Sequence, residues 1–143
     1  MTVKSFKILK NKIIKNKKGS VIKFLTKKNI YFKSFGEIYF SEINANKTKG
    51  WNYHKKNNCI IIVPFGKVKF WFIDGRKNYS SYHKEDKIII GKQNYKIILI
   101  PPKIWFSFKS ISKISIVANC IDNPHSDNET LKNIKVKNYK IKK

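Results

Sequence analysis

The residues best suited to chemistry in this chain lie in one short segment, Lys49-Gly50-Trp51-Asn52-Tyr53-His54-Lys55. In a β-strand, Asn52 and His54 would point to the same face, because successive side chains alternate between the two faces. Imidazole is the side chain whose ordinary pKa suits taking up and returning a proton near neutral pH. A carboxamide can hold a ligand oxygen but cannot move a proton. We therefore predict that this strand forms a wall of an active site, with His54 as the catalytic residue.

Further residues are candidates for binding the substrate. Lys49 and Arg76 carry positive charge that suits an anionic ligand, and His125 lies in a polar stretch near the C-terminus. We predict substrate-binding roles for these three residues and for Asn52. The plainer alternatives are that His54 is a half-exposed strand histidine without a role and that His125 is a surface loop residue.

The same segment argues against a metal site. A catalytic zinc site needs three protein ligands of suitable type. In the window after Gly50 the chain offers only His54, with Asn52 at the other candidate position and no acidic residue before Asp74. We predict no bound metal and no other cofactor.

The elements that position these residues are predicted to be strands. Short runs rich in β-branched and aromatic residues recur along the chain, separated by turn-forming sequences, and no segment has helical periodicity. We predict nine strands, over residues 21–25, 36–43, 51–54, 59–63, 68–73, 87–90, 95–100, 105–108 and 114–121. This spacing is typical of an all-β sandwich or closed barrel. We expect a single domain over residues 1–143, with its core at about residues 19–129.

The two ends of the chain have their own patterns. Residues 127–133 predict one or two helical turns, with Ser126 or Asp127 as N-cap and Glu129 in the first turn. The lysine-rich stretch from about 132 to 143 is expected to be an edge strand or a frayed tail. Residues 1–20 contain frequent lysines and no uninterrupted apolar run, which indicates neither a signal peptide nor a membrane span.

Charge and cysteine content bear on partners and location. A net charge of +24 ordinarily indicates a nucleic-acid or anionic-membrane partner. However, Arg76 is the only arginine, and lysine, isoleucine and asparagine, which share A/T-rich codons, make up about half of the chain. Lysine also cannot copy the bidentate contacts of arginine. We therefore expect no nucleic-acid or membrane partner. Cys59 and Cys120 lie in apolar strand patterns, which indicates buried reduced thiols and a cytoplasmic protein.

Five segments together carry a resemblance to a known family. In chain order they are FGEIYFSEI, KGWNYHKK, IIIVPFGKVKFWFIDGRKNYSSY, ILIPPKIWFSFKSIS and IVANCIDNPHSDNE. They resemble the sugar-nucleotide epimerase branch of the cupin superfamily, the dTDP-4-dehydrorhamnose 3,5-epimerase-like proteins. The resemblance implies an antiparallel jelly-roll barrel, a homodimer, and a pocket for a nucleotide-linked 4-keto sugar.

This chain departs from the epimerase pattern at the catalytic positions. The family uses an Arg-Gly-x-His-Tyr-Gln motif, a lysine on the next strand and a late tyrosine. Here the arginine and histidine positions are Lys49 and Asn52, the lysine position falls near Cys59, and the tyrosine position falls near residues 123–125. The 3,5-epimerase mechanism is therefore not carried over.

The related dTDP-sugar 3,4-ketoisomerases fit one position better. Their Arg-Gly-x-His-x-His-Lys motif is matched at Gly50, His54 and Lys55. The resemblance implies an epimerase or isomerase that acts on a dTDP-linked 4-keto-6-deoxyhexose by proton abstraction and return, with His54 moving the proton. Two alternatives stay open: a cupin without catalysis that binds sugar nucleotides or a protein partner, and, more weakly, a basic nucleic-acid-binding barrel.

Overall fold

The structure is a computed structural model that describes residues 6–132 of the chain. Twelve strands and no helix occur in this part. They are β1 (Lys7–Lys10), β2 (Ile13–Ile14), β3 (Val21–Ile22), β4 (Glu37–Asn44), β5 (Thr48–His54), β6 (Cys59–Phe65), β7 (Lys67–Asp74), β8 (Glu85–Gly91), β9 (Lys96–Ile100), β10 (Ile104–Ser110), β11 (Ile114–Ile121) and β12 (Thr130–Lys132).

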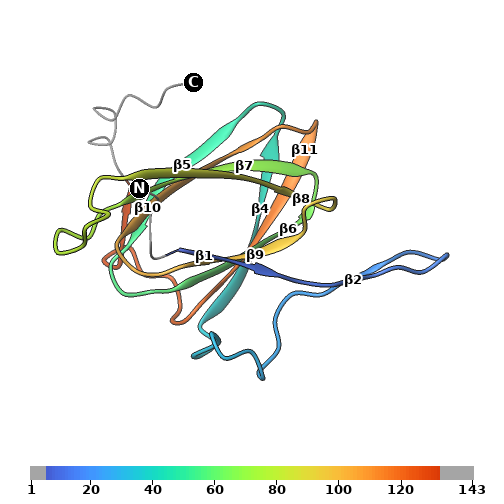
Figure 1. The fold of residues 1–143 in the computed structure, drawn as a ribbon, viewed down its shortest axis with the longest axis horizontal. Helices are drawn as coiled ribbons and strands as arrows, with labels where there is room; N and C mark the ends of the chain where they lie inside the picture. The colour runs from blue at the N-terminus through green and yellow to red at the C-terminus, as the bar shows by residue number, and fades with distance from the viewer. Residues whose placement is uncertain (1–5, 133–143) are drawn as a thin grey trace.

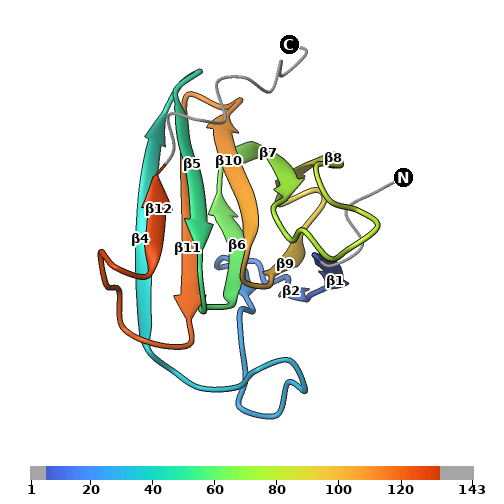
Figure 2. The same ribbon diagram turned by 90° about the vertical axis from the view of Figure 1, so that its left-hand side faces the viewer.

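Ten of these strands form two five-stranded antiparallel sheets that face each other (Figures 1 and 2). The first sheet has the order β1-β9-β6-β11-β4, and the second has the order β12-β5-β10-β7-β8. Strands β4 and β5 are consecutive in the chain but lie in opposite sheets. The prediction of a single all-β domain is confirmed.

The main core fills the space between the sheets. Ile61 and Val63 of β6 and Phe70 and Phe72 of β7 are fully buried, and the ring of Phe6 stacks on Phe72 with 4.2 Å between centroids. Burying each such side chain stabilises the fold by roughly 1.5–3 kcal/mol. The buried residues of this core come from β6 through β11, together with Ile43 of β4, and a cavity lies between β4 and β5.

A second apolar cluster lies on the outer face of the first sheet. There Ile60, Ile97 and Cys120 are covered by side chains of the N-terminal segment, among them Leu9 and Phe24. Cys59 belongs to the main core instead, so the two free cysteines lie in separate clusters.

Eight of the predicted runs correspond to β4 through β11, and the bounds of β11 agree with the prediction at both ends. The run over residues 21–25 forms only the short strand β3. Strands β1, β2 and β12 were not predicted, because all three lie at sheet edges and have at most four residues, so each has only a short sequence pattern. Strands β1 and β12 extend the sheets beyond the expected core of residues 19–129.

The expected helix near the C-terminus is wrong. Residues 127–129 form a single turn, closed by a hydrogen bond from the Glu129 amide to the Ser126 carbonyl, and strand β12 follows at once. Pairing of β12 with β5 outweighs the local helical signal. Residues 133–143, with most of the lysine-rich stretch, lie outside the described part of the chain.

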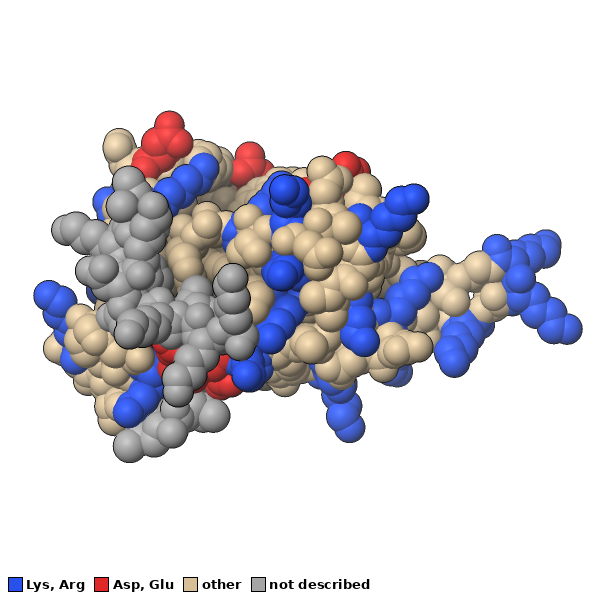
Figure 3. All heavy atoms as spheres, turned by 90° about the horizontal axis from the view of Figure 1, so that it is seen from above, with Lys and Arg blue, Asp and Glu red and all other residues tan. Residues whose placement is uncertain are grey.

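The basic residues are widely scattered over the surface. Figure 3 views the molecule from the side of β5 and β7, and blue lysine and arginine side chains are scattered over that face. Further ones line the β2–β3 hairpin, which projects from the body in Figure 1. The described residues form no helix long and apolar enough to cross a membrane.

Candidate active site

A β-bulge in β5 shapes the wall of the site. Phe106 of β10 lies opposite Asn52, but the next residue, Ser107, lies opposite Gly50, so Trp51 has no partner in the register. Gly50 has a φ of +106°, and a Cβ there would lie 2.8 Å from the Phe106 carbonyl oxygen. Glycine is therefore required for this close approach.

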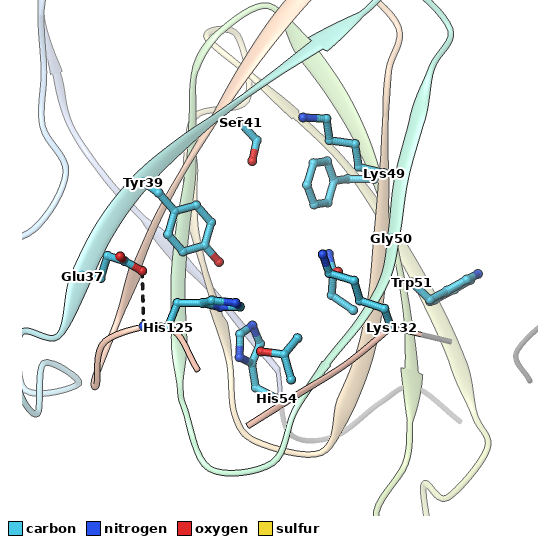
Figure 4. A pocket seen from close by; sticks show the side chains of 12 residues that line it. Glu37, Tyr39, Ser41, Lys49, Gly50, Trp51, His54, His125 and Lys132 are labelled. Atoms are coloured by element: carbon cyan, nitrogen blue, oxygen red, sulfur yellow. Dashed lines mark hydrogen bonds between the residues drawn. The ribbon is translucent and has the colours of Figure 1, made fainter. Parts of the chain in front are cut away.

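The bulge changes which side chains share a face. Lys49 is three residues before Asn52, and regular alternation would place these two side chains on opposite faces. With the extra residue between them, Lys49, Asn52 and His54 all line the same cavity, whereas Trp51 points away from it (Figure 4).

This cavity has a volume of about 860 Å³ and lies between β4 and β5. That volume is within the range of small-molecule sites. Its remaining walls come from β4, β10, β12 and the segment before β12, and they are formed by Glu37, Tyr39, Ser41, Phe108, His125, Thr130 and Lys132.

His54 is held in the cavity by a carboxylate. Its Nδ1 lies 2.7 Å from Glu129 Oε2, and the imidazole is only 5% exposed. A carboxylate on Nδ1 fixes the tautomer with the proton on that nitrogen, so Nε2 carries the free lone pair. Nε2 is therefore the atom that can accept a proton from a ligand in the cavity.

Glu129 is itself fixed by the backbone. Its Oε1 accepts hydrogen bonds from the amides of Lys56 and Asn57, each at 2.9 Å. Burial alone would raise the pKa of Glu129, but these backbone hydrogen bonds and the contact with His54 outweigh it and hold the pKa below its usual range. The carboxylate is therefore charged at neutral pH.

The lowered pKa of Glu129 predicts a pH effect on stability. The unfolded chain binds this proton more tightly, so the stabilisation is complete above the ordinary glutamate pKa of about 4.3 and is lost as pH falls through the lower folded value. In Glu129→Gln the free energy of unfolding should fall less steeply on acidification below about pH 5. Urea titrations from neutral to acid pH measure the slope. The exposed carboxylate variant Glu42→Gln should keep the wild-type slope, and equal slopes for Glu129→Gln and wild type would contradict the prediction.

Tyr39 of β4 offers a second polar group to the cavity. Its hydroxyl accepts a hydrogen bond of 2.8 Å from Asn119 Nδ2, which leaves its own proton free to be donated to a ligand. Burial raises the pKa of Tyr39 to about 12, so the phenol is neutral at physiological pH. In Figure 4 the hydroxyl points into the cavity toward His54 and His125.

Four of the five predicted site residues meet in this cavity. Besides Lys49, Asn52 and His54, the structure places His125 there, with its backbone amide 3.3 Å from Glu37 Oε2 and its ring partly exposed. Arg76 is not brought to the cavity. It lines a separate hollow, together with Tyr53, on the other side of β5.

Sequence reasoning missed Glu129, Tyr39, Glu37 and Lys132. A signal for part of this set was present in β4, where Glu37, Tyr39 and Ser41 alternate with Ile38 and Phe40. Alternation normally directs apolar side chains inward, but here the polar set lines the cavity and Phe40 is 68% exposed. Among the residues that the structure describes, no group of three or more His, Cys, Asp or Glu side chains converges as metal ligands would.

Comparison with known proteins identifies the family of this chain. The family described as FdtA, WxcM-like, C-terminal, matches residues 4–140. The chain belongs to this family. The predictions of a cupin of the sugar-nucleotide epimerase branch, and of a nucleotide-sugar epimerase- or isomerase-like protein, are confirmed at the level of the family.

Solved structures show the same fold. A dTDP sugar isomerase from Desulfovibrio desulfuricans G20 has a TM-score of 0.89 at 29% identity, covering 92% of this chain and 85% of that one. The sugar 3,4-ketoisomerase QdtA from Thermoanaerobacterium thermosaccharolyticum, solved in complex with TDP, has a TM-score of 0.76 at 18% identity, covering 93% and 91%.

A curated relative is the probable low-salt glycan biosynthesis epimerase Agl13 from Haloferax volcanii. It is 24% identical over 99 residues, which cover 65% of this chain and 64% of that protein. The match therefore spans less than two thirds of the length of the relative.

Proposed function

We propose that this protein isomerises a dTDP-linked 4-keto-6-deoxyhexose by moving a proton between neighbouring ring carbons, with His54 as the base. The observation that carries the proposal is the buried His54–Glu129 pair, which leaves Nε2 free in a cavity that also receives the Tyr39 hydroxyl. The other histidine in the cavity, His125, is partly exposed, and its ring lies 3.3 Å from Asp127. One enclosed base suits proton return to the face from which the proton was taken, as in 3,4-ketoisomerisation.

The reaction can be written with these two groups. His54 Nε2 removes the proton from C3 while the Tyr39 hydroxyl protonates the carbonyl oxygen on C4, which gives a 3,4-enediol and a tyrosinate. Tyrosinate then takes the proton from the hydroxyl on C3, and the imidazolium delivers its proton to C4. The carbonyl group has moved from C4 to C3, and both residues return to their starting states.

The rest of the substrate has matching partners in the cavity. The ammonium groups of Lys49 and Lys132 can meet the charge of the diphosphate, as lysine commonly does with phosphate oxygens. Asn52 and His125 can hydrogen-bond sugar oxygens. Arg76 has no part in this proposal, because it lies on the other side of β5.

A second candidate is a binder of sugar nucleotides without catalysis. It is favoured by Asn52, which stands where the resembled ketoisomerases have a first histidine and cannot transfer a proton. The two candidates share the cavity and differ only in whether a proton leaves the sugar.

Solvent exchange distinguishes these possibilities. We expect incubation with dTDP-4-keto-6-deoxyglucose in heavy water to produce the 3-keto isomer. NMR should show exchange at C3 of the 4-keto sugar and at C4 of the 3-keto isomer, and none at C5. Exchange at both C3 and C5 without carbonyl migration would indicate a 3,5-epimerase instead. Measurable binding with neither carbonyl migration nor exchange would indicate the binder without catalysis.

We also propose that the protein acts as a homodimer in the cytoplasm, with both cysteines reduced. Support for the dimer comes from the apolar outer face of the edge strand β4, where Ile38 and Phe40 are exposed. The β2–β3 hairpin adds Ile14 and Val21, each at least half exposed. A second copy related by a two-fold axis could cover both surfaces at once.

The dimer is tested by light scattering at low micromolar concentration. The wild-type protein should have twice the chain mass, and Phe40→Ser should shift the equilibrium toward the monomer because a serine hydroxyl contributes little apolar area. Ile89→Ser, at an exposed apolar position in the other sheet, serves as the control and should stay dimeric. A wild-type protein that has only the monomer mass at moderate salt would overturn the proposal.

A further inference from the structure

The hollow that contains Arg76 is a second candidate site, separate from the His54 cavity. It has a volume of about 650 Å³ and lies where β5, the loop after β7 and the loop before β10 meet. Tyr53 faces this hollow and the next residue, His54, faces the cavity, so the two sites lie on opposite sides of the same strand.

The described residues that line this hollow are basic or neutral, and none is acidic. Four cationic side chains contribute, from Lys55, Arg76, Lys77 and Lys103, and the other lining residues are neutral. Lys55, Lys77 and Lys103 are all exposed residues, so a ligand can reach them from solvent. Lys55 Nζ also donates a hydrogen bond of 2.7 Å to the Asn128 carbonyl oxygen.

Arg76 is held in a fixed position within this hollow. Its Nε and Nη2 donate to Asp74 at 2.9 and 2.6 Å, and Asp74 is fully buried. On its other side the guanidinium lies 3.5 Å from the centre of the Tyr79 ring. The side chain therefore loses little freedom when a ligand arrives, which favours binding.

Lys103 occupies a backbone conformation that lysine disfavours. Its φ is +68°, in the left-handed region that suits glycine or asparagine. Two hydrogen bonds hold it there, from its amide to the His54 carbonyl and from the Gly75 amide to its own carbonyl. Asparagine has equally A/T-rich codons and would fit this conformation better, so codon bias alone does not account for a lysine here.

Both aromatic rings of the hollow already have a partner on one face. Tyr79 is stacked on Arg76, and Tyr53 packs on Trp105 with 4.6 Å between ring centres. The Gly75 backbone also lies against the Tyr53 ring, since a Cβ on Gly75 would be 2.9 Å from it. Tyr79 is still 53% exposed, but a compact anion needs only the cationic groups and no aromatic ring.

We propose that this hollow binds a multivalent phosphate anion of about diphosphate size, independently of the His54 cavity. Several lysine ammonium groups around one guanidinium match the separated charges of two linked phosphates better than the single charge centre of one phosphate.

Titration of the full chain with sodium pyrophosphate, followed by amide NMR at constant ionic strength, tests this proposal. We expect saturable shifts at Gly75, Lys77 and Lys103, with inorganic phosphate at least about tenfold weaker. In Lys77→Ala/Lys103→Gly the dissociation constant should rise about tenfold or more, because hydrogen bonds to charged groups are lost. The melting temperature of Lys103→Gly should not fall, since glycine relieves the positive φ.

Two controls separate this site from general attraction and from the His54 cavity. Lys92→Ala/Lys113→Ala removes the same charge at exposed positions outside the hollow and should leave the dissociation constant within about twofold. Lys49→Met should leave the shifts at Gly75 and Lys103 in place. Shifts confined to Lys49 and Asn52, equal weakening in both double variants, or shifts that never saturate would overturn the proposal, and none of these outcomes depends on whether the protein is an isomerase.

Discussion

Replacing His54 with asparagine should reduce turnover of the keto sugar by a factor of about 10² to 10⁴, the usual contribution of a general base. The nucleotide should still bind with nearly unchanged affinity, because Lys49 and Lys132, not the imidazole, are proposed to meet the diphosphate. Proton exchange at C3 in heavy water measures the chemical step, and calorimetry with dTDP measures binding.

His125→Asn is the matched control for this experiment. Its ring lies in the same cavity but is 43% exposed, and its contact with Asp127 is long, at 3.3 Å. We expect exchange to survive in this variant, with at most a weaker apparent affinity for the sugar. Exchange lost in His125→Asn and retained in His54→Asn would reverse the assignment of the base.

The largest effect on stability is expected at Asp74. This carboxylate is fully buried and accepts hydrogen bonds from the side chains of Arg76 and Ser81 and from the Arg76 amide. Burial alone would raise its pKa, but the hydrogen bonds from Arg76 and Ser81 outweigh it and hold the pKa below its usual range. Asp74→Ala leaves the largely buried guanidinium without its partner, which costs about 3–5 kcal/mol.

Urea unfolding measures this loss against two comparison variants. Asp86→Ala, whose carboxylate accepts a hydrogen bond from the next backbone amide, should change the free energy of unfolding by less than about 0.5 kcal/mol. The double variant Asp74→Ala/Arg76→Met should be more stable than Asp74→Ala alone, because no unpaired charge remains. A loss below about 1 kcal/mol in Asp74→Ala would show that solvent already reaches this pair.

Short-range sequence patterns were enough to predict most of the strands and the shared face of Asn52 and His54. The runs that became β4 through β11 are rich in β-branched and aromatic residues and end at turn sequences, and both signals act within a few residues. The common face of Asn52 and His54, with Tyr53 on the other side, follows from alternation over three residues.

Contacts between distant parts of the chain decided the rest. Glu129 is 75 residues from His54 in sequence, and its neighbours predicted a helical turn, so only the pairing of β12 with β5 brings its carboxylate to the imidazole. The bulge at Gly50 turns Lys49 into the cavity, against the alternation that sequence alone predicts.

The sequence by itself therefore determined most of the strand pattern, the family, and the strand with Asn52 and His54 on one face, because these depend on residue type and short-range spacing. Tertiary structure decided which side chains surround that histidine. It turned the polar face of β4 toward the cavity and placed Arg76 on the opposite side of β5. These positions depend on how the two sheets and their loops pack, and no local pattern in the chain encodes that packing.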